Sequence, residues 1–195
     1  PQAKIVEWYT KGIFMRIAVI GPQNTGKSRV IKDFLAEFSH YVSPEDTYRT
    51  IIETKGLEVN QKTNLESQKE IRDFIFGQLR HNTKYNIIFD RCMIDNYVYT
   101  YVQYEKGEIP KWFVEETESM MIDTLRSVDL YLFIPTALSV PLLDDGTRDV
   151  TPSYIDTVNN QFLRILFELS RKHHITIKVI SGTPEERIEQ IKKLI

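Results

Sequence analysis

The sequence predicts an α/β fold of three layers, in which helices cover both faces of a five-stranded parallel sheet. Short apolar runs with the length of buried strands alternate along the chain with longer segments whose apolar residues recur at helical spacing. A glycine-rich loop at residues 21–28 lies between the first of these runs and the first of these helices. This is the order of elements found in α/β proteins that bind phosphate groups.

The composition fits one globular domain. The chain has 195 residues, of which 42% are hydrophobic, and this is enough to bury a core. A formal net charge of −2 does not favour binding to nucleic acid or to a membrane surface. The single cysteine, Cys92, excludes an internal disulfide framework and favours a reducing compartment. With no signal peptide and no apolar run long enough to cross a bilayer, we expect a cytoplasmic protein.

Five short segments, most of them apolar, are the expected strands. Each has the length of a buried strand rather than of a helix. The second run ends at Pro44, which interrupts strand pairing, and the third ends in a carboxylate, Asp90. The five runs are residues 14–20, 39–44, 86–90, 128–135 and 175–180.

The segments between these strands have apolar residues three and four positions apart, which is typical of helices that pack on a sheet. Gly56 ends the second of these helices, and Pro110 and Pro184 lie near the starts of two later ones. Residues 93–106 are rich in tyrosine at helical spacing, and we interpret these rings mainly as packing residues. The other expected helices are residues 28–38, 45–57, 64–79, 110–126, 151–173 and 185–195.

The domain that these elements form is expected to cover residues 15–195. Residues 1–14 are expected to form an N-terminal extension, because Met15 lies where the first strand begins. The polar stretch at about 136–152 follows the fourth strand and is expected to be a loop that closes over a bound ligand as a lid.

The glycine-rich loop has the pattern G-x-x-x-x-G-K-S, which predicts ATP binding. Its two glycines let the backbone curl so that successive N–H groups face one oxyanion, and the following helix adds the positive end of its dipole. Lys27 would reach the β- and γ-phosphates, and the Ser28 hydroxyl would hold Mg²⁺. The expected ATP-binding residues here are Gly21, Asn24, Thr25, Gly26, Lys27, Ser28 and Arg29.

Asp90 and Arg91 follow an apolar strand, and ligands of parallel sheets bind at the carboxyl ends of the strands. A carboxylate at this point can hold Mg²⁺ or accept a proton from the nucleophile, so Asp90 joins Ser28 as an expected metal ligand. The cation of Arg91 can stabilise transferred charge or bind a second phosphate.

Three further residues are candidates for the functional site, and each of them also has a simpler structural explanation. Arg148, in the expected lid, would neutralise developing charge, or it is a solvated loop arginine. Arg49 would line the acceptor side of the site, or it forms a surface salt bridge. Asp95 would bind a substrate base or ribose, or it caps its helix. The four histidines have no ligand-like spacing, so a zinc site is not expected.

Together these motifs resemble those of the P-loop kinases of nucleosides and nucleoside monophosphates. The likeness is to thymidylate-kinase-like and nicotinamide-riboside-kinase-like domains, many of them phage or bacterial, and it covers about residues 15–195. The resemblance implies that Asp90 and Arg91 serve the acceptor and magnesium, that Arg148 is a lid arginine, and that Gly182 and Thr183 lie against the adenine of ATP. Cys92 stands where thymidylate kinases usually carry an aromatic residue.

The expected function is therefore that of an ATP- and Mg²⁺-dependent kinase that transfers the γ-phosphoryl group to a nucleoside or nucleotide. Lys27, Asp90, Arg91 and Arg148 would be catalytic, and Arg49, Arg91 and Asp95 would bind the acceptor. One alternative is a kinase that acts on a hydroxymethylated base or an end of DNA. Another is an ATPase or nucleotide sensor that binds a protein partner. A homodimer is compatible with each of them, and a membrane partner is not expected.

Overall fold

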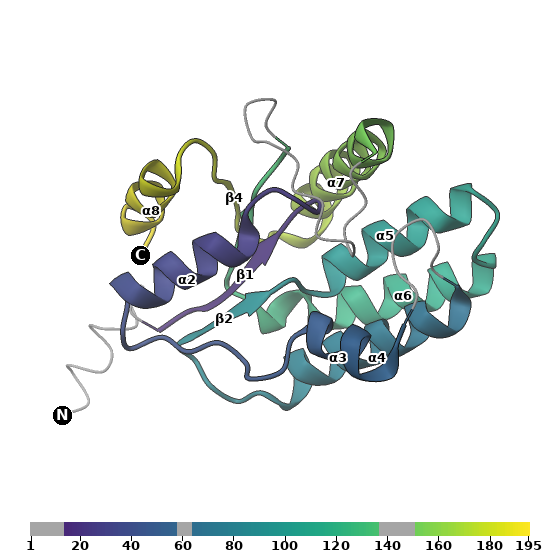
Figure 1. The fold of residues 1–195 in the computed structure, drawn as a ribbon, viewed down its shortest axis with the longest axis horizontal. Coiled ribbons are helices and arrows are strands. Elements are labelled where there is room, and N and C mark those ends of the chain that lie inside the picture. The colour runs from purple at the N-terminus through teal and green to yellow at the C-terminus, as the bar shows by residue number, and fades with distance from the viewer. Residues whose placement is uncertain (1–13, 58–63, 137–150) are drawn as a thin grey trace.

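The computed structural model describes residues 14–57, 64–136 and 151–195, and Figure 1 shows their arrangement. Nearly all of the expected N-terminal extension lies outside these residues. The same holds for most of the expected lid, including Arg148.

The described residues form a four-stranded sheet in the order β2-β1-β3-β4, with every pair of neighbours parallel. The strands are β1 (Arg16–Ile20), β2 (Ile87–Asp90), β3 (Leu130–Phe133) and β4 (Ile177–Val179). Val19 of β1 is in register with Asp90 of β2. The carboxyl ends of these two strands therefore lie side by side, and the segments that follow them meet at one edge of the sheet.

The expectation of a fifth strand at residues 39–44 is wrong. Within this segment only Val42 pairs with the sheet: its N–H donates to the carbonyl of Asn86, and its carbonyl accepts from the N–H of Ile88. The residues before Val42 form a turn, and Pro44 has no N–H to continue the pairing. The segment therefore runs beside β2 as a single bridge and then turns toward the carboxyl end of that strand.

The described part of the chain contains seven α-helices. Their positions confirm the expected helices, and the tyrosine-rich segment is helical as well. None of them is both long and apolar enough to span a membrane. They are α2 (Lys27–Glu37), α3 (Tyr48–Lys55), α4 (Leu65–His81), α5 (Met93–Glu105), α6 (Lys111–Thr124), α7 (Pro152–His173) and α8 (Pro184–Lys192), with a short 3₁₀ turn, η2 (Leu125–Ser127), after α6.

The sheet separates two hydrophobic cores, which makes the expected three layers. Successive side chains of a strand point to opposite faces, so each strand contributes to both cores. Ile17 and Val19 of β1 pack with α2 and α8 on one face, whereas Ala18 and Ile20 pack with the core that α4, α5, α6 and α7 form on the other. Figure 1 shows α2 and α8 on one side of the strands and the larger group of helices on the other.

Candidate active site

The glycine-rich loop connects β1 to α2 at the centre of the sheet, and two of its positions admit only glycine. Gly21 has a φ of 140°, and a Cβ on it would lie 2.3 Å from the carbonyl oxygen of Ile134, just after β3. Gly26 has a φ of 84° and precedes the first residue of α2. A larger residue would push the loop away from the sheet at the first position and would strain the backbone at both. The loop geometry therefore explains the spacing of the glycines.

Lys27 lies over this loop. Its ammonium group donates to the carbonyl oxygen of Gly21 at 2.8 Å and to that of Pro22, and the side chain is buried. The hydroxyl of Thr25 also donates to Pro22, at 3.0 Å. The lysine thus lies at the loop, and its amine would have to leave these carbonyl oxygens in order to bind phosphate oxygens.

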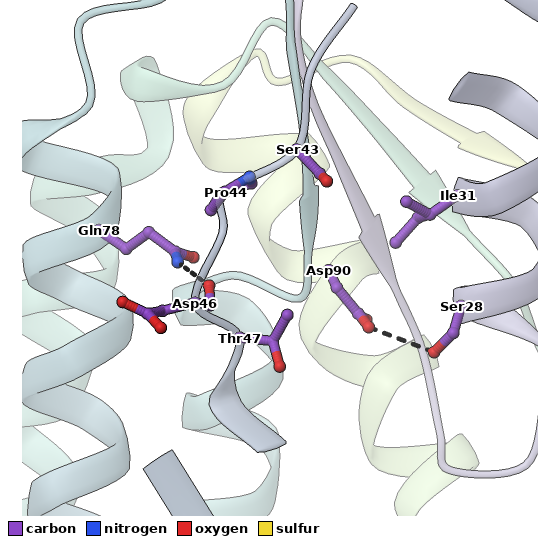
Figure 2. Close-up of a pocket in the computed structure, with 8 residues that line it drawn as sticks. All are labelled: Ser28, Ile31, Ser43, Pro44, Asp46, Thr47, Gln78 and Asp90. Atoms are coloured by element: carbon purple, nitrogen blue, oxygen red, sulfur yellow. Dashed lines mark hydrogen bonds between the residues drawn. The ribbon is translucent and has the colours of Figure 1, made fainter. Parts of the chain in front are cut away.

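Ser28 and Asp90 face each other across the adjoining ends of α2 and β2. The Ser28 hydroxyl donates to a carboxylate oxygen of Asp90 at 3.3 Å, as Figure 2 shows. A hydroxyl and a carboxylate are hard oxygen ligands of the kind that Mg²⁺ takes in nucleotide sites. No cluster of three or more metal-binding side chains occurs among the described residues. A magnesium ion held here would therefore rely on phosphate oxygens for further ligands, and the donor set fits that use.

Arg91 is buried between two tyrosines at the end of β2. Its guanidinium carbon lies 4.5 Å from the ring centre of Tyr48 and 5.2 Å from that of Tyr99, and Asp95 pairs with it at 3.4 Å. Its φ of 76° is unusual for a residue other than glycine, and such backbone strain clusters at functional sites. The Nε atom is buried and has no hydrogen-bond partner in the described part of the chain. Arg91 therefore keeps one donor available at the site.

Asp95 joins the start of α5 to the phosphate loop. Its carboxylate accepts from the N–H of Gly21 at 3.2 Å and from that of Cys92 at 3.1 Å, so it also caps its helix. Burial raises the pKa of Asp95 to about 6, although the charges of Arg91 and Lys27 lower it in part. These contacts make Asp95 a support for the loop and for Arg91.

The sequence indicates a packing role for Tyr99, but its hydroxyl also forms hydrogen bonds with the phosphate loop. Its hydroxyl accepts from the main-chain N–H of Gln23 at 3.0 Å and donates to the side-chain oxygen of the same residue. The aromatic spacing of α5 predicts that this ring packs, and Tyr99 is partly buried against the core. The spacing carried no signal for the contact with Gln23, which lies 76 residues earlier in the chain.

Gly182 and Thr183 form the turn between β4 and α8. Thr183 caps α8: its hydroxyl accepts from the N–H of Glu186, whose carboxylate accepts from the N–H of Thr183. The carbonyl of Gly182 accepts a hydrogen bond from Arg187, which also reaches the phosphate loop. No sequence motif marks Arg187, because an arginine in a helix that follows an acidic first turn is an ordinary surface pattern.

Three further arginines were predicted for this site. Arg29 lies on the exposed side of α2 and pairs with Asp33 at 2.7 Å. Arg49 belongs to α3, and its side chain is outside what the structure describes. Arg148 lies outside the described residues altogether.

A cavity of about 90 Å³ opens next to Asp90. Ser28 and Asp90 form one wall, and the segment after the Val42 bridge forms the opposite one (Figure 2). The side chain of Gln78 in α4 donates to the Asp46 carbonyl at 2.7 Å and holds that segment in place. The volume equals about three water molecules, so it takes one small polar group or part of a larger ligand. The lining residues are Ser28, Ile31, Ser43, Pro44, Asp46, Thr47, Gln78 and Asp90.

This combination of parallel sheet, phosphate loop and neighbouring carboxylate defines a P-loop protein with the fold of the nucleoside and nucleotide kinases. The model of a protein family described as an AAA domain matches residues 16–187. Because this match covers most of the chain, the protein belongs to that family. No curated protein matches the sequence.

Solved structures of three kinds resemble the fold. A deoxyadenosine kinase from M. mycoides has a TM-score of 0.67 and 17% identity, over 92% of this chain and 97% of that one. A thymidylate kinase from Candida albicans has a TM-score of 0.64 and 18% identity, over 93% of this chain and 91% of that one. A NadR protein in complex with NR has a TM-score of 0.62 and 18% identity, over 87% of this chain and 46% of that one. At such identities the likeness concerns the fold.

Proposed function

We propose that the protein is an ATP- and Mg²⁺-dependent kinase that transfers the γ-phosphoryl group to a nucleoside or a nucleotide. The main support for the proposal is the hydrogen bond from Ser28 to Asp90, which lies between the phosphate loop and a cavity. Phosphoryl transfer requires the donor phosphate, a metal and the acceptor to meet in line. The pair lies where these three would converge.

On the donor side, the main-chain N–H groups of the loop and the start of α2 would bind the phosphates of ATP. Lys27 would turn from the carbonyls of Gly21 and Pro22 toward the β- and γ-phosphates. Ser28 and Asp90 would hold Mg²⁺, which neutralises charge on the phosphates during the transfer. In this arrangement the protein contributes mainly position and electrostatic stabilisation.

On the acceptor side, the cavity between Asp90 and residues 43–47 would receive the group that is phosphorylated. Asp90 is close enough to this space to accept a proton from an acceptor hydroxyl. Arg91, with one buried donor available, would contact the acceptor and the transferred charge. The names of the similar structures include kinases of deoxyadenosine and of thymidylate, which supports a nucleoside or a nucleotide as acceptor.

Arg49 and the lid at about 136–152 complete the proposal. Arg49 starts from the first turn of α3, close in sequence to the cavity residues Asp46 and Thr47, and would extend the acceptor side. Closure of the lid would bring Arg148 to the phosphates and would keep water from taking the phosphoryl group.

The test is an ATP-consumption screen with nucleosides, nucleoside monophosphates and DNA that contains hydroxymethylated bases. The proposal predicts that a nucleoside or nucleoside monophosphate stimulates ATP consumption and becomes phosphorylated, with Mg²⁺ required. Stimulation by DNA alone would favour the DNA kinase. Slow ATP turnover that no acceptor stimulates would favour a nucleotide sensor and would contradict the proposal.

A further inference from the structure

We propose that Arg187 of α8 is a positioning residue for the nucleotide donor, and that it holds the phosphate loop and the turn before α8 in one fixed arrangement. The inference rests on the proposed function, because it concerns the same nucleotide site. It adds a residue that no sequence motif indicates.

The contacts of Arg187 join two distant parts of the chain. One terminal nitrogen of its guanidinium donates to the carbonyl oxygen of Thr25 at 2.7 Å, across 162 residues of sequence. Its Nε donates to the carbonyl oxygen of Gly182 at 2.9 Å. The side chain is only 6% exposed. A planar guanidinium that bonds to two carbonyls at once fixes both in position and in direction.

The bond to Thr25 determines how the phosphate loop presents its donors. In a trans peptide unit the C=O and the following N–H point in opposite directions. Because Arg187 holds the Thr25 carbonyl toward α8, the N–H of Gly26 is directed to the other side. That N–H is one of those that a P-loop aims at the phosphates. A Cβ at Gly26 would lie 3.0 Å from the Arg187 guanidinium, so the glycine also makes room for the contact.

The bond to Gly182 reaches a turn that is itself rigid. Both main-chain polar groups of Ser181 bond to the side chain of Gln190, and Thr183 caps α8. Arg187 therefore connects the phosphate loop to a turn that its own hydrogen bonds hold in place. If the turn lies beside the nucleotide base, as the resemblance to nucleoside kinases implies, then one side chain sets the spacing between the phosphate and base ends of the site.

The charge of Arg187 also favours an anion nearby. Among the described residues no carboxylate pairs with it, and burial lowers the pKa of its guanidinium, which still remains protonated. Arg72, another buried arginine, has two acidic partners, Asp73 and Glu116. A buried cation without a counter-charge is costly, and the phosphates of a nucleotide would supply one.

The experiment measures the affinity for MgADP and for inorganic pyrophosphate by titration calorimetry, with thermal melting of each variant. Arg187→Met keeps the bulk of the side chain and removes the donors, and Arg187→Lys keeps the charge but reaches one carbonyl at a time. Arg72→Met is the matched control, since it removes a buried arginine far from the loop in the chain and outside the nucleotide site. Lys27→Ala tests the nucleotide site itself.

We expect Arg187→Met to weaken MgADP binding about tenfold or more, as the loss of charged hydrogen bonds implies. The affinity of this variant for pyrophosphate should fall less than its affinity for MgADP, because only the nucleotide spans both the loop and the turn. Arg72→Met should lower the melting temperature and leave both affinities within about twofold of wild type.

An unchanged affinity in folded Arg187→Met would overturn the inference, provided that Lys27→Ala weakens binding. Should Arg187→Met fail to fold, Arg187→Lys decides: about a threefold loss supports the inference, and wild-type affinity overturns it. If the wild-type protein binds neither probe, the proposed function fails, and the role of Arg187 fails with it.

Discussion

The hydroxyl of Ser28 donates to the carboxylate of Asp90 at 3.3 Å, which links the first turn of α2 to the end of β2. The residues are 62 positions apart in sequence. They meet because β1 and β2 are parallel neighbours with Val19 in register with Asp90. This contact places a hydroxyl and a carboxylate on one side of the phosphate loop, and the kinase proposal depends on it.

Asp90→Asn should lower kcat by about 10²-fold or more and raise the Mg²⁺ concentration that the reaction needs. The substitution keeps the shape of the side chain but removes the negative charge that would hold the metal. Steady-state kinetics over a range of Mg²⁺ concentrations measure both effects. Asp33→Asn is the control, because Asp33 lies on α2 and pairs with Arg29 at the surface. Equal Mg²⁺ dependence in the two variants would remove Asp90 from the metal site.

Lys27→Ala should abolish phosphoryl transfer while the protein remains folded. Hydrogen bonds join the lysine amine to three groups of its own loop, at Gly21, Pro22 and Thr25. Its loss should therefore disturb the loop locally and not the sheet. Transfer assays and circular dichroism give the two readouts, with the exposed Lys32→Ala on the same helix as control. Undiminished transfer would refute the role given to the phosphate loop.

Arg148→Ala should lower kcat by about 10²-fold or more and affect ATP affinity less. The reason is that a lid arginine is proposed to contact charge that develops in the transition state. Comparison of kcat with the ATP dissociation constant separates these effects, and Arg126→Ala on the exposed side of η2 serves as control. An unchanged kcat would make Arg148 a solvated loop residue, which is the simpler interpretation of the sequence.

Asp95 should make stability depend on pH. Burial raises its pKa in the folded protein to about 6, above the value near 4 of an unfolded aspartate. Between these values the folded state binds the proton and the unfolded state does not, so stability falls as pH rises. Relative to Asp95→Asn, the wild type should therefore lose up to about 3 kcal/mol of unfolding free energy between pH 4 and pH 7.

Urea denaturation of both proteins at several pH values measures this difference. Arg91 and Lys27 remain charged over the whole range, so the change reports the aspartate. A constant difference between the two proteins from pH 4 to pH 7 would mean that Asp95 titrates as an exposed carboxylate does.

The parts of the site that the sequence predicted are the local ones. The phosphate loop depends on residues within one short segment, and Asp90 is marked by the apolar strand before it. The parts that it missed depend on distant contacts. Tyr99 reaches Gln23 across 76 residues, and Arg187 reaches Thr25 across 162, while the spacing of either residue indicates only a helix.

The wrong strand has a related cause. The segment around Val42 has the length of a strand and contains Tyr41 and Val42, but strand formation also requires a partner over several residues. Here Pro44 and the preceding turn leave one residue able to pair with β2. The outcome matters for the site, because the chain is then free to turn and to form the cavity wall opposite Asp90.

The most direct test of the account follows the γ-phosphoryl group itself. Wild-type protein and Lys27→Ala are incubated with γ-³²P-labelled ATP, Mg²⁺ and a panel of nucleosides and nucleoside monophosphates, and the products are separated. The account predicts a labelled nucleotide product with the wild-type protein that needs Mg²⁺ and is absent with the variant. The account would be contradicted if only labelled inorganic phosphate formed with every acceptor, or if both proteins formed equal amounts of labelled nucleotide.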